Sequence, residues 1–160
     1  MISFHRDGRR FHFRAGAIAL HHEHVLLHRL EGDEFWAVPG GRVEMGEQAS
    51  NAIEREFHEE LGLSVHCGPL LCVGENFFEY QGEPHHEVGL YFAIQLPPDS
   101  SIQRLDVVHV GVEGHRRLEF KWFAQRELET IDFRPLALRA MLGLGASIQP
   151  HFIQHASNAA

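Results

Sequence analysis

The sequence predicts a single α/β domain of the mixed α+β type, and three observations support this. Residues 11–40 have the pattern of β structure, residues 47–61 have the composition of a helix, and several later apolar segments are again typical of strands. The chain has 160 residues, of which 44% are hydrophobic and 22% charged, as in one compact domain with its own core. We therefore treat residues 1–160 as one domain.

The first forty residues are expected to form a hairpin and a short strand. Alternating apolar side chains predict a strand over residues 11–20, and Val25-Leu26-Leu27 follows after the histidine-rich turn at residues 21–24. A further strand is predicted for residues 35–38. It ends at Pro39-Gly40-Gly41, where the chain needs backbone without side chains.

Residues 47–61 contain helix formers and no Gly or Pro, and Gly62 stands where a left-handed C-cap requires glycine. Strands are expected over residues 70–73, 76–80, 88–96, 105–112 and 118–123, followed by a helical turn at 125–129 and a closing helix after Pro135. Beyond Gly145 we expect a frayed tail.

Charge and composition exclude several classes of function. The formal net charge is −8, and no stripe of Lys and Arg follows the chain, so binding to duplex nucleic acid is not expected. No apolar run reaches the roughly 18 residues of a membrane helix, and no signal peptide opens the chain. Cys67 and Cys72 are too few for a disulfide framework and are expected in the core. We expect a cytoplasmic protein that does not bind membranes.

Three glutamates of the predicted helix form the main candidate site. Glu56, Glu59 and Glu60 share one helix face beside an apolar stripe that includes Ile53 and Phe57. Like charges at this spacing repel one another, and carboxylate oxygens suit Mg²⁺ or Mn²⁺ far better than zinc. The alternative is an ordinary solvated acidic face.

The wider pattern decides between these two interpretations. Residues 41–63 match the Nudix box at every fixed position, namely Gly41, Glu47, Arg55, Glu56, Phe57, Glu59, Glu60, Gly62 and Leu63. A chance match is on the order of one in a billion per starting position. The sequence therefore resembles the Nudix hydrolases of the MutT type, and the resemblance covers about residues 11–145. It implies an α/β/α sandwich with a mixed sheet.

The resemblance also implies chemistry for the box. Glu56 and Glu60 would be metal ligands, Glu59 a ligand or the group that activates water, and Arg55 with Glu47 an orienting ion pair. The carbonyl of Gly40 or Gly41 would add a ligand. The implied reaction is Mg²⁺- or Mn²⁺-dependent hydrolysis of a nucleoside diphosphate linked to another moiety.

The substrate itself is left open. A nucleoside triphosphate or a modified deoxynucleoside triphosphate is favoured, with dinucleoside polyphosphates and ADP-ribose or another nucleotide sugar as alternatives. A sensor that binds a nucleotide without turnover is the non-enzyme alternative. Homodimers are common in the family, so a homodimer is also left open.

Candidates outside the box complete the expected site. Glu87 stands before an apolar strand, where it would bind metal or act as base; the alternative is an exposed glutamate at a strand end. Arg14, Arg29 and Arg42 are candidates for phosphate or ribose contacts, and Tyr80 is a candidate for substrate contact. The histidines of residues 21–24 lack the ordered spacing of a zinc site, and a solvated turn accounts for them. His85 or His86, near Glu87, would instead contact the phosphates of the substrate.

Overall fold

Two β-sheets form the middle of the structure, a computed structural model that describes residues 1–156. The larger sheet has the strand order β1-β2-β7-β6-β10, with β5 paired to β2 on the same side as β1. The bounds are β1 (Ser3–Arg6), β2 (Arg9–Ile18), β5 (Gly40–Arg42), β6 (His66–Tyr80), β7 (Glu83–Gln95) and β10 (His151–His155). This sheet is mixed, because β2 pairs with β7 and β6 pairs with β10 in parallel, whereas the other pairs are antiparallel.

The smaller sheet is antiparallel, in the order β3-β4-β9-β8. Its strands are β3 (Leu20–His21), β4 (His24–Leu30), β8 (His109–Glu113) and β9 (Arg116–Ala124). The β3–β4 turn is tight because both His22 and Glu23 have positive φ, at 47° and 59°, as hairpins of the primed turn types require.

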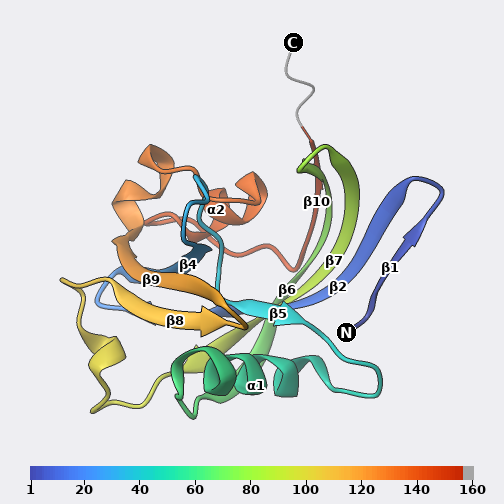
Figure 1. The fold of residues 1–160 in the computed structure, drawn as a ribbon. Coiled ribbons are helices and arrows are strands. Elements are labelled where there is room, and N and C mark those ends of the chain that lie inside the picture. Colours follow the sequence, from blue (N-terminus) through green and yellow to red (C-terminus); the bar gives the residue numbers. More distant parts are fainter. Residues whose placement is uncertain (157–160) are drawn as a thin grey trace.

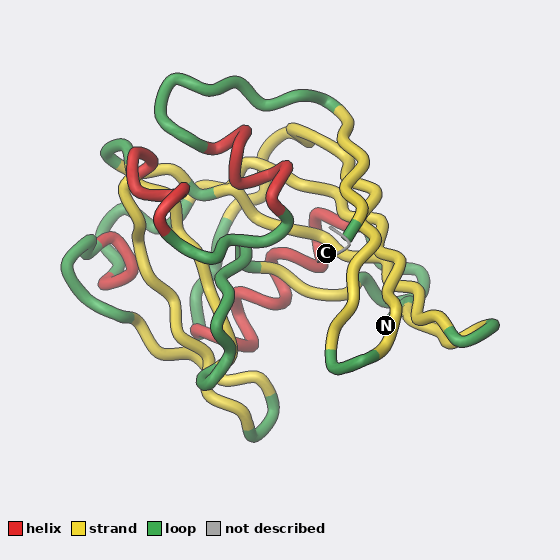
Figure 2. Tube along the Cα trace, turned by 90° about the horizontal axis from the view of Figure 1, so that it is seen from above, coloured by secondary structure: helices red, strands yellow, loops and turns green. Residues whose placement is uncertain are grey.

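Helices cover both sides of the sheets. Helix α1 (Ala49–Leu61) lies on one side, and α2 (Leu136–Leu142) with the short helix η2 (Gln125–Thr130) lies on the other (Figure 1). The remaining short helix, η1 (Ser101–Gln103), lies between β7 and β8 in the chain. Seen from above, the hairpin tips of the larger sheet extend beyond the helices (Figure 2). This confirms the predicted mixed α+β fold class.

Each helix layer has its own hydrophobic cluster. The apolar face of α1, represented by Ile53 and Phe57, packs on Ala15 and Ala17 of β2 and on Phe120 of β9. On the opposite side, α2 packs on a cluster drawn from both sheets, whose members include Tyr91, Trp36, Leu27 and Phe152. At roughly 1.5–3 kcal/mol for each large apolar side chain that is fully buried, these two clusters hold the helices against the sheets.

Several local predictions are wrong in detail. Helix α1 begins at Ala49 rather than at residue 47, although Gly62 is the expected left-handed cap, with φ 66°. The strands expected at residues 70–73 and 76–80 are one strand, β6. The strand expected at residues 35–38 is not formed. Within these residues, Trp36 makes an isolated bridge with Phe133 and Ala37 makes one with His28.

Two more expectations, both for the last third of the chain, are wrong. Strand β8 spans only the end of the expected 105–112 segment. The tail is not frayed throughout, since β10 at residues 151–155 adds a parallel strand to β6; the remainder of the expected tail, residues 157–160, lies outside the described residues. The sheet therefore extends beyond the expected 11–145 region at both ends.

Candidate functional site

Strand β5 and the loop after it bring the chain to the base of α1. Gly40 has φ 142°, and a Cβ there would overlap the carbonyl of Ala15 on β2. A Cβ on Gly41 would overlap the Glu56 carboxylate. Both positions therefore require glycine. At Gly40 the backbones of β5 and β2 come too close for a side chain, and at Gly41 the Glu56 side chain of α1 occupies the place of a Cβ.

Arg55 organises the acidic residues around the start of α1. Its Nε donates to Glu47 Oε1 at 2.8 Å and its Nη2 to Glu47 Oε2 at 3.2 Å, which is a bidentate ion pair. Its Nη1 donates to Glu56 Oε1 at 2.9 Å and to Glu59 Oε2 at 3.2 Å. These contacts raise the pKa of Arg55, chiefly through the hydrogen bonds that it donates to Glu47. The expected Arg55–Glu47 ion pair is present, and one guanidinium orients three carboxylates.

Glu60 has a different environment from the other two glutamates of the helix face. Only 6% of the residue is exposed, whereas Glu59 is largely exposed, and no Lys, Arg or His within residues 1–156 lies at ion-pair distance from Glu60. Burial, together with the nearby charges of Glu56 and Glu113, raises the pKa of Glu60 to about 8. Burial also raises the pKa of Glu56. A cation brought to this place would relieve a concentrated negative charge.

The donor set fits a hard divalent cation of the kind that keeps part of its water. Within residues 1–156, no three Asp, Glu, His or Cys side chains are gathered closely enough to hold a metal by themselves. Mg²⁺ commonly uses one or two carboxylates together with waters and substrate phosphates, a demand that Glu56 and Glu60 could meet. The room that Gly41 leaves beside the Glu56 carboxylate is consistent with this mode of binding.

Arginines lie next to these acids on the neighbouring strands. Arg14 of β2 pairs in register with Arg42 of β5, and neither makes an ion pair among the described residues. Arg14 donates to the carbonyl of Val38 at 3.0 Å and lies 3.5 Å from Nε2 of His28. Burial lowers the pKa of Arg42, as do the positive charges of Arg10 and Arg14. Unbalanced positive charge beside buried acids is an arrangement that suits a phosphate chain bound together with a metal.

Glu87 lies in the larger sheet, near these arginines. On β7 it is paired in register with His12 of β2 on one side and with Asn76 of β6 on the other, and cross-strand partners share a face. Burial raises the pKa of Glu87, while Arg14, a hydrogen bond from Asn76 and Arg42 oppose that shift. The alternative of an exposed glutamate at a strand end is wrong, because Glu87 is inside the strand and partly buried.

A pocket of about 250 Å³ lies against the same part of the sheet. Its lining residues are Arg10, Arg42, Tyr80, Gln81, Glu83 and His85. Glu83 accepts from Arg10 Nε at 2.9 Å, and Nδ1 of the buried His85 lies 2.6 Å from Nε2 of His12. The structure therefore brings two of the expected substrate residues, Arg42 and Tyr80, into one pocket. We call it the arginine pocket.

Similarity to known proteins assigns this chain to a family. The family model of the NUDIX domain matches residues 10–141, more than half of the chain. The chain belongs to the Nudix family. The MutT Nudix hydrolase from Burkholderia pseudomallei is similar in structure, with a TM-score of 0.53 and 26% identity over 72% of this chain and 84% of that one. The MutT protein from Bacillus halodurans has a TM-score of 0.57 and covers 90% of both chains at 16% identity, which bears on the fold alone.

Two curated relatives carry names that refer to nucleotide substrates. A putative ADP-ribose pyrophosphatase, YjhB, from Bacillus subtilis (strain 168) is 25% identical over 95 residues, which cover 59% of this chain and 46% of the relative. An 8-oxo-dGTP diphosphatase from Proteus vulgaris is 33% identical over 76 residues, which cover 44% of this chain and 68% of the relative. The chain thus spans less than half the length of the first relative.

Arg29, the third arginine expected to contact substrate, is engaged elsewhere in this Nudix domain. Its Nε donates to Glu119 Oε2 at 2.8 Å, and its guanidinium lies 4.4 Å from the centre of the Trp36 ring. It does not line the arginine pocket. A contact between Arg29 and substrate stays a prediction, and the structure gives this side chain an ion pair and a cation–π contact.

Sequence reasoning missed two residues of the arginine pocket, Arg10 and Gln81. Arg10 had a usable signal, because Arg10, His12 and Arg14 alternate along a strand and so must share one face. Gln81 had none, since its position depends on the turn between β6 and β7.

No helix among residues 1–156 is long and apolar enough to cross a membrane.

Proposed function

We propose that this Nudix domain is a divalent-metal-dependent pyrophosphohydrolase that cleaves the diphosphate linkage of a nucleotide. The observation that carries the proposal is the placement of the buried Glu60 and the partly buried Glu56 near Arg14 and Arg42, which have no carboxylate partner among residues 1–156. A phosphate chain needs positive charge along its length, and an attacking water needs a carboxylate that accepts its proton.

In this proposal each residue has a separate task. Glu56 and Glu60 would hold Mg²⁺ or Mn²⁺, which when bound lowers the pKa of water and neutralises phosphate charge. Arg14 and Arg42 would hold the phosphate oxygens, and Arg55 would keep Glu56 and Glu59 in place through its contacts at 2.9 and 3.2 Å. Water would attack one phosphorus of the linkage, the bridging P–O bond would break with its oxygen leaving on the other phosphate, and the proton of the water would pass to a carboxylate. The products would be a nucleoside monophosphate and the remaining phosphorylated moiety.

Two carboxylates remain candidates for the general base. Glu59 is on the exposed side of the helix, and Arg55 fixes one of its oxygens. Glu87 is partly buried in the sheet with a raised pKa, which is the direction expected for a base that works near neutral pH. Substituting each with Gln separates the two assignments.

The favoured substrate is a nucleoside triphosphate or a modified deoxynucleoside triphosphate. The arginine pocket, at about 250 Å³, is large enough for one base or one ribose beside the phosphates. The name of one curated relative refers to 8-oxo-dGTP, a modified deoxynucleoside triphosphate, and the name of the other refers to ADP-ribose, one of the alternatives. Dinucleoside polyphosphates complete the set.

The test is a turnover screen with purified protein and Mg²⁺ or Mn²⁺. The panel contains nucleoside triphosphates, 8-oxo-dGTP, dinucleoside polyphosphates and ADP-ribose, with products identified by mass spectrometry. Glu60→Gln should lower turnover on the order of a hundredfold or more, because it removes a carboxylate that would hold the metal. The domain should stay folded, because the neutral amide keeps the size of the side chain and is not repelled by Glu56. Glu129→Gln, an exposed glutamate of η2, is the matched control.

Arg42→Met tests the phosphate side of the site. Loss of one charged contact should raise KM roughly tenfold at low salt, with a smaller effect on kcat. Turnover by Glu60→Gln at the wild-type rate would overturn the metal assignment. Metal-dependent nucleotide binding without hydrolysis of any compound in the panel would support the sensor alternative.

A further inference from the structure

Five aromatic rings lie side by side across the larger sheet, near the hairpin ends of its strands. They belong to Phe4 of β1, Phe11 of β2, His86 of β7, Phe77 of β6 and His155 of β10, and each is the register partner of the next. The centroids of neighbouring rings lie 5.1, 5.3, 4.4 and 4.9 Å apart in that order, distances typical of interacting aromatic pairs. We call these five residues the aromatic row.

The aromatic row is on the face of the sheet opposite the arginine pocket. Arg10 and His85 line that pocket, so their neighbours Phe11 and His86 point to the other side of the strands. This is the face that α1 covers at Ala15, but the row lies further along the strands, in the hairpins that extend beyond the helices (Figure 2). None of the three phenylalanines of the row belongs to either hydrophobic cluster.

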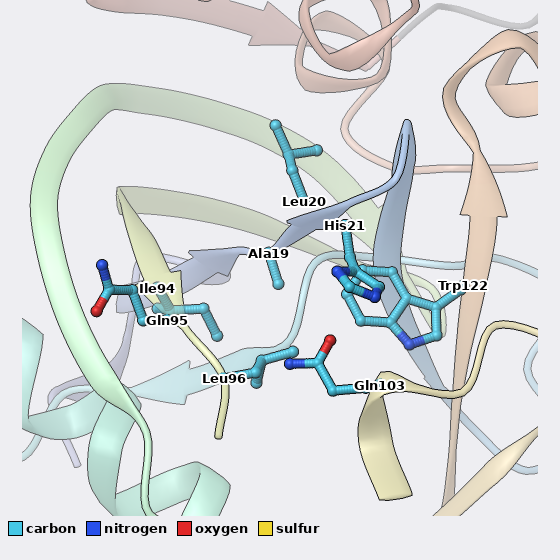
Figure 3. Close-up of a pocket in the computed structure, with 8 residues that line it drawn as sticks. All are labelled: Ala19, Leu20, His21, Ile94, Gln95, Leu96, Gln103 and Trp122. Atoms are coloured by element: carbon cyan, nitrogen blue, oxygen red, sulfur yellow. The ribbon is translucent and has the colours of Figure 1, made fainter. Parts of the chain in front are cut away.

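The two ends of the larger sheet differ in how they are covered. At the far end of β7, residues from β3, η1 and β9 lie against the strand around a cavity of about 300 Å³ (Figure 3). At the aromatic row, Phe4 is 53% exposed, and Ile153, two residues before His155 on β10, is 55% exposed. With strands about 4.8 Å apart, the row and the side chains beside it form a patch on the order of 500 Å². Apolar patches of that size on a monomer commonly bind a partner.

Opposite charges flank β7 on this face of the sheet. Arg9 stands two residues before Phe11 on β2, and Glu79 stands two residues after Phe77 on β6, so both side chains point to the face of the aromatic row. Both are exposed, and neither makes an ion pair among residues 1–156. The patch is therefore basic on its β2 side and acidic on its β6 side.

We propose that the aromatic row is the interface of a homodimer, in which a second copy of this chain packs face to face on it. The two-fold axis is parallel to the strands and passes over β7. This rotation reverses the strand order of the second copy, so that β2 lies over its β6 and β1 lies over its β10. Phe11 then faces Phe77 of the second copy, and Arg9 faces Glu79 of the second copy, across the roughly 10 Å that separate packed sheets.

Charge complementarity favours a second copy over other occupants of the patch. By symmetry the contact between Arg9 and Glu79 occurs twice, which sets the two copies in one register. A single-stranded nucleic acid could stack on the rings, but the acidic β6 side of the patch would repel its phosphates. The dimer leaves the arginine pocket open on the opposite face, so this proposal does not depend on the hydrolase activity.

Sedimentation velocity of the wild-type chain at about 2–300 µM tests the association. The patch is smaller than the roughly 800 Å² that each partner contributes to a standard interface, so we expect a dissociation constant on the order of 10–100 µM. Arg9→Glu and Glu79→Arg each oppose like charges twice and should weaken the dimer about tenfold or more. The double variant restores both pairs and should dimerise within about threefold of wild type. Arg126→Glu, at an exposed arginine of η2 outside the patch, is the matched control and should leave the association unchanged.

A wild-type chain that stays monomeric at the highest concentration would overturn the proposal. A double variant that dimerises no better than the single variants would also overturn it, because the pairing of Arg9 with Glu79 would then be wrong. Phe4→Gln, at an exposed position, should weaken the dimer while circular dichroism stays unchanged. A fluorescent oligothymidylate that binds monomeric wild type and loses affinity for Phe4→Gln would assign the patch to single-stranded nucleic acid instead. The concentration series uses wild-type protein and does not require any variant to fold.

Discussion

Removing the Arg55 guanidinium should reveal how strongly one residue stabilises α1 and the acidic residues around it. Only 25% of the Arg55 side chain and 15% of the Glu47 side chain are exposed, so water screens this bidentate pair less than an ordinary surface pair. Arg55→Met also leaves Glu56 and the carbonyl of Arg42 without their donor. Hydrogen bonds to charged groups contribute about 1.5–3 kcal/mol each, and loss of several partly buried ones should cost about 2–4 kcal/mol.

A double-mutant cycle isolates the Arg55–Glu47 contribution. Urea unfolding of wild type, Arg55→Met, Glu47→Gln and the double variant should give a coupling free energy of about 2 kcal/mol at pH 7. In thermal unfolding, Arg55→Met alone should lower Tm by roughly 5–15 °C. The hydrogen bonds from Arg55 lower the pKa of Glu47, so the coupling is complete above the usual carboxyl pKa of 4.5 and is lost as pH falls below it.

A small coupling free energy would contradict the proposed role of Arg55. A coupling below about 0.5 kcal/mol at pH 7 would mean that the pair behaves like an exposed salt bridge. Arg55 would then not be the organiser of the helix, and its place in the box would require a direct contact with substrate. A Tm change with no change in turnover would limit its role to folding.

Three other predictions concern the site and its pH dependence. Gly41→Ala should lower turnover at least roughly tenfold while the fold persists, because its Cβ would displace the Glu56 carboxylate; steady-state kinetics and circular dichroism check this. Of Glu87→Gln and Glu59→Gln, the variant that removes the general base should abolish the acidic limb of the kcat profile, while the other keeps it. Burial lowers the pKa of His28 to about 3, so below pH 6.5 this residue should destabilise the fold by about 1.4 kcal/mol per pH unit; His28→Phe should remove that slope in urea titrations between pH 6.5 and 5.

Local chemistry explains which elements could be predicted from the sequence. The helix ending at Gly62 and the tight turn at His22 and Glu23 depend on neighbouring residues only, so composition and turn preference are enough to find them. Strand β10 could not be found this way. Its five residues pair in parallel with β6, a partner more than seventy residues earlier in the chain, and their own pattern is weak.

The residues of the candidate site also differ in whether the sequence alone predicts where they lie. Glu56 and Glu59 lie one and four residues after Arg55 on the same helix, so their spacing predicts that they are close, and the ion pair of Arg55 with Glu47 was expected from the resemblance to the Nudix box. The arginine pocket instead depends on β2, β5 and the β6–β7 hairpin meeting in one register, which the sequence does not encode locally. Arg29 shows that residue type alone can mislead. An arginine suits a phosphate contact, but the pairing of β4 with β9 places Arg29 opposite Glu119, to which it donates.

The alternation of side chains along β2 connects the fold to the proposed chemistry. Arg10 and Arg14 stand on one face of this strand, while Ala15 and Ala17 stand in the cluster that packs on α1. Small side chains on that second face let the helix approach closely enough for Glu56 to reach Gly41. A shift of one residue in the β2–β7 register would exchange the faces and turn the arginines into the apolar cluster beneath α1. The register that buries the helix therefore also keeps Arg10 and Arg14 on the opposite face of β2, outside that cluster.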